Sequence, residues 1–139
     1  MSSLYLVAGS SDGIVVGTGN KVEDFGVGFF TKYGDGGVDI SPIADLLKTE
    51  VYKIGGELGI NKDIITAAPT DGLWRDDKTD EDQIGATYPE LEWAMGYKGN
   101  TNNLTFREKE VLAIYNKLNV SNQHKMHAIP ICRIPKNLK

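Results

Sequence analysis

Hydrophobic positions recur at helical spacing in three segments of the chain. The first opens at Ser41-Pro42, an N-cap followed by proline at the first helical position, and stops at Gly59. The second and third open with capping boxes, Thr87 to Glu90 and Thr105 to Glu108. We therefore predict helices over 41–58, from 87 and from 105, with a short helical turn over 61–66. The last helix is expected to bury Val111, Leu112, Tyr115 and Leu118.

One segment has the pattern of a strand. Residues 12–17, Asp-Gly-Ile-Val-Val-Gly, form a β-branched run bounded by glycines, which is typical of a strand buried on both faces of a parallel sheet. An α/β layer needs several parallel strands joined by crossovers, and no other segment has this pattern. Two interpretations stay open here: a fragment whose other strands lie upstream, or a mostly helical domain with one isolated strand.

The remaining segments predict irregular structure. Residues 26–37 are rich in glycine around three aromatic side chains, which indicates a mobile loop. Residues 67–82 combine proline and glycine with an acidic run, and we expect them to be irregular and exposed. The tail over 128–135 is apolar but holds two prolines, which favours an extended strip over a central strand.

Length, net charge and cysteine content limit the classes of function that this chain could have. A chain of 139 residues that is 40% hydrophobic can bury one core. The net charge of -4 argues against a nucleic-acid partner, which needs a clustered basic face. The single Cys132 fits a reducing compartment, and no run approaches the ~20 apolar residues of a membrane span. We expect a soluble, cytoplasmic protein with no membrane partner.

Two candidate ligand residues follow the predicted strand. In Gly17-Thr-Gly-Asn-Lys, the backbone would emerge at the carboxyl end of the sheet, where open α/β folds bind ligands, so Thr18 could contact one. Glu23 could offer a carboxylate to a magnesium ion that bridges phosphates, because Mg²⁺ needs few protein ligands. The plainer alternatives are a tight turn at Thr18 and a solvated Glu23.

Further candidates lie in the glycine-rich loop and after the last helix. Lys32 could neutralise a phosphate, and Asp35 or Asp39 could bind a ribose hydroxyl or orient an amine on a backbone that glycines keep free. The alternative is a surface turn. His124 and Lys125 could act as ligands or simply place positive charge at a helix C-terminus.

Taken in order, these motifs resemble the NAD synthetase family over essentially the whole chain. Each motif is weak by itself, but their shared order is specific. The matching segments are Gly17-Thr-Gly-Asn-Lys-Val-Glu-Asp-Phe-Gly, Phe30-Thr-Lys-Tyr-Gly-Asp-Gly-Gly-Val-Asp-Ile-Ser-Pro-Ile-Ala-Asp-Leu, Lys48-Thr-Glu-Val-Tyr, Pro69-Thr-Asp-Gly-Leu-Trp, Thr79-Asp-Glu-Asp-Gln-Ile-Gly, Tyr88-Pro-Glu-Leu and His124-Lys-Met-His.

The resemblance implies a reaction and a role for each candidate. The family adenylates the nicotinate carboxylate of deamido-NAD with ATP and magnesium, and ammonia then displaces AMP. By this resemblance Asp35 lies in the loop that closes over the adenylate, where its carboxylate could accept a proton from ammonium. The implied ligand sets are Thr18, Lys48 and Thr70 for ATP, Lys32, Asp39, His124 and Lys125 for deamido-NAD, and Glu23 for Mg²⁺.

The chain departs from the family at its start. Family members carry a Ser-Gly-Gly-x-Asp-Ser loop that grips the ATP pyrophosphate well upstream of Gly17, and this chain lacks it. We therefore expect an α/β fold in which residues 1–139 form the C-terminal portion of a doubly wound parallel sheet, with an incomplete sheet and mostly helices and loops.

The same departure bears on activity and partners. We expect the isolated chain to be inactive without a complementing N-terminal half, and the family's homodimer to be compromised. The alternative is a non-catalytic remnant or a dinucleotide-binding module. Ammonia is the expected nitrogen donor, although the sequence leaves glutamine open.

Overall fold

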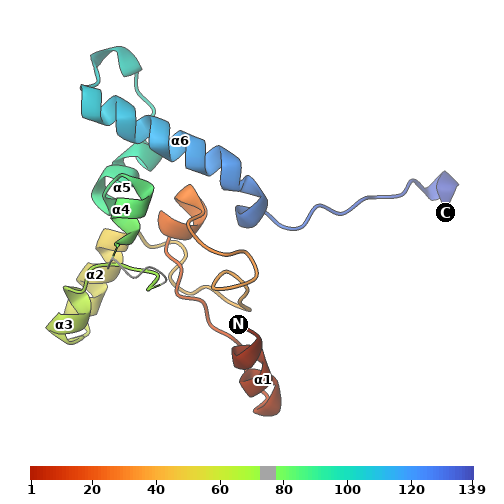
Figure 1. Cartoon of the computed structure of the whole chain (residues 1–139). Helices are drawn as coiled ribbons and strands as arrows, with labels where there is room; N and C mark the ends of the chain where they lie inside the picture. Colours follow the sequence, from red (N-terminus) through yellow and green to blue (C-terminus); the bar gives the residue numbers. More distant parts are fainter. Residues whose placement is uncertain (73–77) are drawn as a thin grey trace.

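The computed structural model describes residues 1–72 and 78–139, whose regular structure is mostly helical (Figure 1). The α-helices in this part of the chain are α1 (Ser2–Ser10), α2 (Lys48–Glu57), α3 (Lys62–Ile65), α4 (Asp80–Ile84), α5 (Tyr88–Gly96) and α6 (Phe106–Met126). Shorter turns are the π-helical η1 (Glu23–Val27) and the 3-10 turns η2 (Thr101–Asn103) and η3 (Lys136–Leu138).

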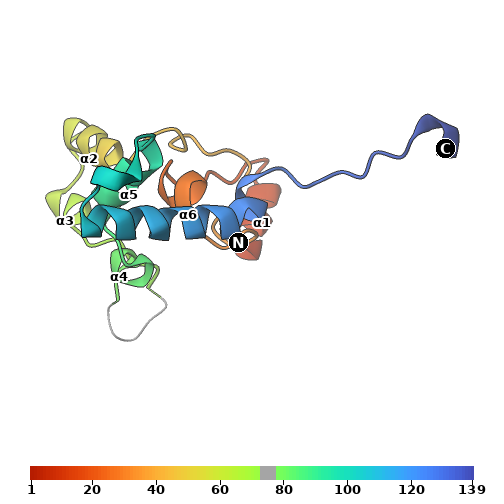
Figure 2. The same ribbon diagram turned by 90° about the horizontal axis from the view of Figure 1, so that it is seen from above.

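The core lies where α5, α6 and η1 meet. Figures 1 and 2 both show η1 against the long helix α6, and α5 packs on the same helix. Val22 and Val27 from the η1 region, Leu91 from α5 and Val111 from α6 are each at most 1% exposed. The prediction for the last helix is therefore confirmed at Val111, while the other three apolar residues of that face are partly buried against this core.

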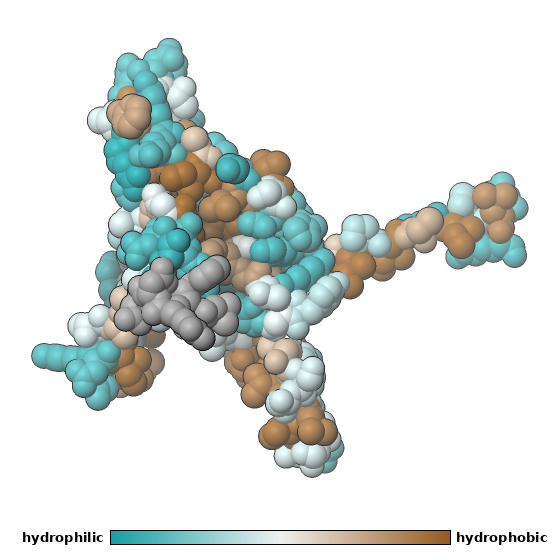
Figure 3. Space-filling view, in the orientation of Figure 1, coloured by the Kyte–Doolittle hydropathy of each residue, from teal (hydrophilic) through white to brown (hydrophobic). Residues whose placement is uncertain are grey.

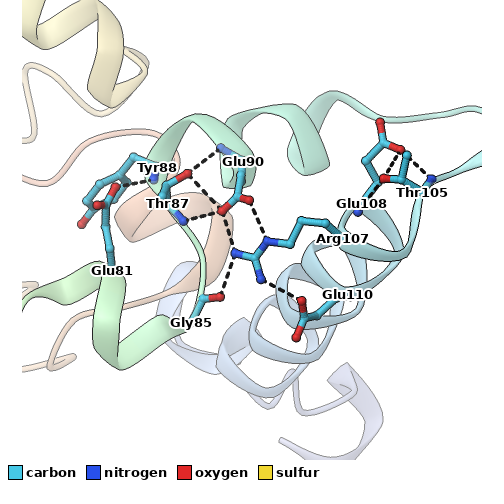
Figure 4. Close-up of polar contacts among 9 residues, drawn as sticks. All are labelled: Glu81, Gly85, Thr87, Tyr88, Glu90, Thr105, Arg107, Glu108 and Glu110. Carbon is cyan, nitrogen blue, oxygen red and sulfur yellow. Dashed lines mark hydrogen bonds and ion pairs between the residues drawn. The ribbon is translucent and has the colours of Figure 1, made fainter.

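Helix starts that depend on local capping agree with the sequence prediction. The amide of Thr87 donates to Glu90 Oε2 at 2.8 Å, and the amide of Thr105 donates to Glu108 Oε2 at 2.7 Å (Figure 4). The short turn is also confirmed as α3. These starts are encoded within four residues, so no tertiary contact is needed to recognise them.

The prediction that residues 67–82 are irregular and exposed is wrong at its end. Thr79 opens α4 with a further capping box, in which its amide donates to Asp82 Oδ2 at 3.1 Å. Asp80, in the first turn of α4, is only 5% exposed. The first part of the acidic run and Leu73-Trp74 lie in residues 73–77, outside the described residues.

Helix α2 begins later than predicted, at Lys48 in place of Ser41-Pro42. The carbonyl of Leu46 accepts a hydrogen bond from the Lys21 amide at 2.8 Å, so this carbonyl is used for a tertiary contact and not for a helical turn. The predicted end is confirmed, because Gly59 follows the helix with a φ of 70°, in the left-handed region that suits glycine.

The predicted strand over 12–17 forms one parallel bridge, between Val16 and Ile40, and Asp12 at its start lies in a turn with a φ of 50°. The Gly17 amide donates to the Ile40 carbonyl at 2.7 Å, and the Asp39 amide donates to the Val15 carbonyl at 2.9 Å. Residues 1–72 and 78–139 contain no longer strand, so the doubly wound parallel sheet is not confirmed within them. Parallel sheets are covered on both faces, whereas Val16 is 52% exposed.

Two terminal segments extend away from the core (Figures 1 and 2). Helix α1, which the sequence pattern did not reveal, has no buried residue. The tail from residue 128 is extended as predicted, but it is exposed throughout and covers no other element. Among the described residues, no helix combines the length and apolarity that a membrane span requires.

Arg107 joins α5 to α6 with a bidentate ion pair (Figure 4). Its Nε and Nη2 atoms lie 2.7 and 2.8 Å from the two Glu90 oxygens, and its Nη1 lies 2.8 Å from Glu110 Oε2. Nη2 also donates to the carbonyl of Gly85 at 3.2 Å. The Arg107 guanidinium lowers the pKa of Glu90 to about 2.

Replacing Arg107 should weaken the α5–α6 contact. Because Arg107 and Glu90 are 46% and 31% exposed, we expect Arg107→Ala to lower the free energy of unfolding by a small amount at pH 7. The folded pKa of Glu90 lies below its ordinary value, so this stabilisation is lost as pH falls from about 4.5 toward 2. Urea denaturation at pH 7 and pH 3 measures both effects. Arg133→Ala, in the exposed tail, is the control, and equal midpoints for the two variants would contradict the prediction.

Candidate functional site

Glu23 and Lys48, 25 positions apart in the sequence, meet in the structure. Lys48 Nζ lies 3.3 Å from Glu23 Oε2, and the two side chains are 18% and 19% exposed. The buried Asn20 fixes the start of η1, because its Oδ1 accepts the amides of Val22 and Glu23 at 3.2 and 3.1 Å. Its Nδ2 donates to the Glu23 carboxylate. Glu23 is therefore held by a neutral donor and a cation before any ligand arrives.

Tyr88 and Asp80 extend this arrangement from α5 and α4. Lys48 Nζ lies 4.8 Å from the centroid of the Tyr88 ring, and the Tyr88 hydroxyl donates to Asp80 Oδ2 at 3.4 Å. The other Asp80 oxygen, Oδ1, is buried and has no hydrogen-bond partner in the described part of the chain. Burial raises the pKa of Asp80, and the nearby Glu23 charge raises it further while Lys48 opposes both.

Asp24 adds a third carboxylate beside Glu23. Burial, followed by the charges of Glu23 and Asp35, raises the pKa of Asp24 to about 7, against the opposing effect of Lys48. Its carboxylate lies against the backbone of Gly19, where a Cβ atom would come within 1.7 Å of Asp24 Oδ2. A larger residue at position 19 would displace this carboxylate from its present position.

The donor set around Glu23 suits a magnesium ion that arrives with phosphates. In the described ranges no three His, Cys, Asp or Glu side chains could hold a metal ion by themselves. Magnesium is commonly bound through one or two carboxylates, with substrate phosphates and water as the other ligands. The raised pKa of Asp24, which is due first to burial and then to the charges of Glu23 and Asp35, and the Asp80 oxygen without a hydrogen-bond partner are both features that a nearby cation would stabilise.

A row of side chains on α6 binds the end of η1 and the loop that follows it. Asn119 Nδ2 donates to the carbonyl of Gly26 at 2.7 Å, and Asn122 Nδ2 donates to that of Val27 at 2.8 Å. These residues and Lys125 are spaced by three, so they lie on one face of the helix. Sequence analysis did not identify the two asparagines, whose partners are more than 90 positions away.

Lys125 ends this row and lines two cavities. Its Nζ donates to the carbonyls of Gly28 at 2.8 Å and Phe30 at 2.7 Å. One cavity, of about 780 Å³, also contains Lys32 and Tyr5, and the other, of about 530 Å³, contains Asp35.

Two predicted dinucleotide ligands meet at the C-terminal end of α6. The ammonium of Lys32 donates to the backbone carbonyl of His124. The His124 side chain is exposed, with its Nδ1 3.2 Å from the Ser121 carbonyl. The structure thus joins Lys32 to the backbone of His124 and not to its ring.

The two loop aspartates hold backbone groups in this structure. Asp35 Oδ1 accepts the Thr31 amide at 2.8 Å. Asp39 Oδ2 accepts the Val15 amide at 2.7 Å, and its Oδ1 accepts the Tyr5 hydroxyl at 3.2 Å. Asp39 therefore connects the segment that contains Val15 to the glycine-rich loop.

The two predicted threonine ligands lie at the surface. Thr18 is exposed, and Thr70 Oγ1 donates to the Lys78 carbonyl at 3.2 Å. No hydrogen bond joins either threonine to Glu23 or Lys48 within residues 1–72 and 78–139. The Asp80 amide does bind the Pro69 carbonyl at 3.0 Å, which attaches the Thr70 loop to α4 and to Asp80.

The comparison with protein families decides what kind of chain this is. A family model described as NAD synthase matches residues 1–129. The chain belongs to the NAD synthase family. Among its relatives, the NH(3)-dependent NAD(+) synthetase of Alkaliphilus oremlandii is 40% identical over 134 residues, which cover 96% of this chain and 50% of that protein. The enzyme of the same name from Methanococcoides burtonii is 51% identical over 92 residues, or 66% of this chain and 34% of that protein.

A solved structure extends the match to three dimensions. The NMN synthetase from Francisella tularensis superposes with a TM-score of 0.81 at 32% identity, covering 96% of this chain and 52% of that one. This NAD synthase chain thus spans about half the length of these proteins or less, and it corresponds to their C-terminal part. The resemblance inferred from the ordered motifs is confirmed.

Removing the Asn20 side chain should disturb the site without touching the α5–α6 contact. Asn20→Ala deletes three hydrogen bonds at a buried position, so we expect the free energy of unfolding to fall by roughly 1–3 kcal/mol. Asn116→Ala, at an exposed position of α6, should be neutral or slightly stabilising. Thermal or urea unfolding of both variants tests this, and an unchanged midpoint for Asn20→Ala would show that the Asn20 contacts do not stabilise the fold.

Proposed function

We propose that this chain supplies the nucleotide-contacting C-terminal half of an NAD synthetase, which amidates deamido-NAD to NAD with ammonia and consumes ATP. The observation that carries the proposal is the pairing of Glu23 with Lys48 at 3.3 Å. Lys32 and Lys125 add two positive charges at the larger cavity. Family membership supports the same reaction, because the named relatives are NAD synthetases.

The Glu23–Lys48 pair is suited to ATP with magnesium. The two opposite charges compensate each other at 3.3 Å. Triphosphate would attract Lys48, and the freed Glu23 carboxylate would become a ligand for Mg²⁺. A bound magnesium ion would neutralise phosphate charge that develops during adenylation. We assign Thr18 and Thr70 to the same nucleotide on the motif resemblance.

The larger cavity is suited to an anionic dinucleotide. Lys32 and Lys125 bring two positive charges to its wall. A lysine ammonium has three donors, and Lys125 uses two on backbone carbonyls, so one N–H is left for a phosphate oxygen. We assign Asp39 and His124 to the same substrate. For Asp39 to bind the substrate through Oδ1, the Tyr5 hydroxyl, which donates to this atom at 3.2 Å, must move away.

Starting from ammonium, the reaction releases two protons. The nicotinate carboxylate attacks the α-phosphate of ATP and pyrophosphate leaves. We propose that Asp35 takes up the first proton, which ammonium releases to become the ammonia nucleophile. Ammonia next attacks the acyl carbon, the bond to AMP breaks, and the nitrogen loses the second proton to water. Asp35 is exposed on a glycine-rich loop, lines the smaller cavity and adds negative charge near Asp24.

A second candidate is amidation of a mononucleotide. It is favoured by the match to a structure named as an NMN synthetase. The two activities differ in whether the substrate carries the adenylate half, so they are separated by comparing deamido-NAD with nicotinate mononucleotide in one assay.

Lys48 provides the sharpest test of the proposed activity. With ammonium, ATP and magnesium, and with an N-terminal NAD synthetase half supplied, we expect Lys48→Ala to lower turnover of deamido-NAD on the order of 100-fold. Lys53→Ala, at an exposed position of the same helix, should leave turnover unchanged. NAD is quantified by chromatography. Equal turnover by the two variants would contradict the role of Lys48.

The isolated chain is assayed in parallel. We expect no turnover from it, and activity would show that the upstream phosphate loop is dispensable. Titration calorimetry with ATP–magnesium and deamido-NAD separates the alternatives. Binding without turnover in the complemented sample would identify a binding module, and no binding would identify a remnant.

A further inference from the structure

We propose that α5 positions the Lys48 ammonium for the phosphates of the nucleotide, with Tyr88 and Glu92 acting on the two ends of the Lys48 side chain. The proposal rests on the assignment of Lys48 to ATP in the proposed function. Tyr88 and Glu92 lie four positions apart on α5, so they share one face of this helix, and α5 packs against α2. They are positioning residues, because each acts through Lys48 and not through a contact with the nucleotide.

Glu92 holds the first turn of α2, where Lys48 lies. The Thr49 amide donates to Glu92 Oε1 at 3.0 Å, and the Thr49 hydroxyl donates to Glu92 Oε2 at 2.8 Å. Amides in the first turn of a helix have no partner inside the helix, and the side chain of the N-cap residue usually accepts one of them. The N-cap of α2 is Leu47, whose side chain has no oxygen. Glu92 therefore caps α2 from a neighbouring helix and fixes the backbone next to Lys48.

Tyr88 lies against the other end of the Lys48 side chain. Lys48 Nζ is 4.8 Å from the centroid of the Tyr88 ring, within the distance at which the face of an aromatic ring attracts a cation. The ring is only 2% exposed, unlike the hydrophobic residues that Figure 3 shows over the α1 lobe. Close packing around a buried ring keeps its orientation, so the ammonium meets a fixed surface.

Helix α4 in turn fixes Tyr88. The Tyr88 amide donates to Glu81 Oε1 at 2.8 Å (Figure 4), and the Tyr88 hydroxyl donates to Asp80 Oδ2 at 3.4 Å. The Asp80 amide binds the Pro69 carbonyl at 3.0 Å. The ring is therefore connected, through Asp80, to the loop that carries Thr70, which is also assigned to ATP.

A lysine needs such support because its side chain is flexible. Its ammonium is a point charge on a four-carbon stem, and fixing this stem on a phosphate costs rotamer entropy. The Lys48 side chain is only 18% exposed, and its Nζ lies 3.3 Å from Glu23 Oε2. With the ring beside the ammonium and the backbone fixed at its base, Lys48 has few other positions when a phosphate replaces Glu23. Part of the rotamer entropy is thus lost on folding and not on binding of ATP.

The alternative is that Tyr88 and Glu92 only stabilise the packing of α2 on α5, and a double-mutant cycle separates the two. The assay uses this chain complemented with an N-terminal NAD synthetase half. We expect Tyr88→Leu and Glu92→Ala each to raise the KM for ATP about tenfold and to leave the KM for deamido-NAD within about twofold. In the Lys48→Ala background the same substitutions should change the KM for ATP by less than about twofold, because no ammonium is left to position.

Two control variants accompany the cycle. Tyr88→Phe keeps the ring and should restore the KM for ATP to within about threefold of the wild-type value. Glu57→Ala removes an exposed carboxylate from the opposite end of α2 and should change neither KM. Circular dichroism checks that each variant is folded, and Glu92→Ala decides the test if Tyr88→Leu does not fold.

A second measurement needs no turnover and uses this chain alone. The ring current of Tyr88 should shift the NMR resonances of the Lys48 Hε protons upfield. We expect Tyr88→Leu to remove this shift and Tyr88→Phe to keep it.

Two results would overturn the proposal. Equal rises of the KM for ATP in the wild-type and Lys48→Ala backgrounds would show that Tyr88 and Glu92 only stabilise the fold. Lys48 resonances that stay the same in Tyr88→Leu would show that the ring does not position the ammonium. Resonances that behave as expected, together with an unchanged KM for ATP in Lys48→Ala, would support the positioning of Lys48 by α5 and contradict the assignment of Lys48 to ATP.

Discussion

The hydrogen bonds from α6 to the end of η1 and to the loop that follows it are the constraint on which the site depends. The last carbonyls of η1 and the carbonyl of Gly28 need partners outside any helix or strand, and Asn119, Asn122 and Lys125 provide them. These contacts hold in place a loop whose residues line both cavities. Without them the buried carbonyls of Gly26 and Val27 would each lack a partner.

Sequence predicts the fold best where structure is encoded locally. The helix starts at Thr87 and Thr105 and the end at Gly59 depend on residues within one turn, and all three agree with the structure. The start of α2 depends instead on a bond between the Leu46 carbonyl and Lys21, 25 positions apart, which no local pattern contains. A capping box at Thr79 was present in the sequence but was obscured by the surrounding acidic run.

The candidate site also combines residues that the sequence predicts with residues that only the structure reveals. Glu23 is a candidate from its place after the predicted strand, whereas Lys48 is one only through the resemblance to a family. Their pairing was not predicted, because their spacing carries no periodic signal. Tyr88 and Asp80 were missed, since they come from α5 and α4 and join the site only through tertiary packing. The ligand assignments remain predictions, and the structure adds to them the hydrogen bonds of Lys125 and Asp39.

Two glycines of the site limit how this region can evolve. At Gly19 a Cβ atom would collide with the Asp24 carboxylate, and at Gly28, with a φ of 64°, it would come within 2.5 Å of Asn122. The Asp24 carboxylate is the end of a side chain that can rotate, so a substitution at Gly19 would move this carboxylate and leave the backbone in place. At Gly28 a substitution would meet Asn122 Cβ and would also strain the backbone, because its φ lies in the left-handed region. Across homologous sequences, position 28 should therefore stay glycine more strictly than position 19.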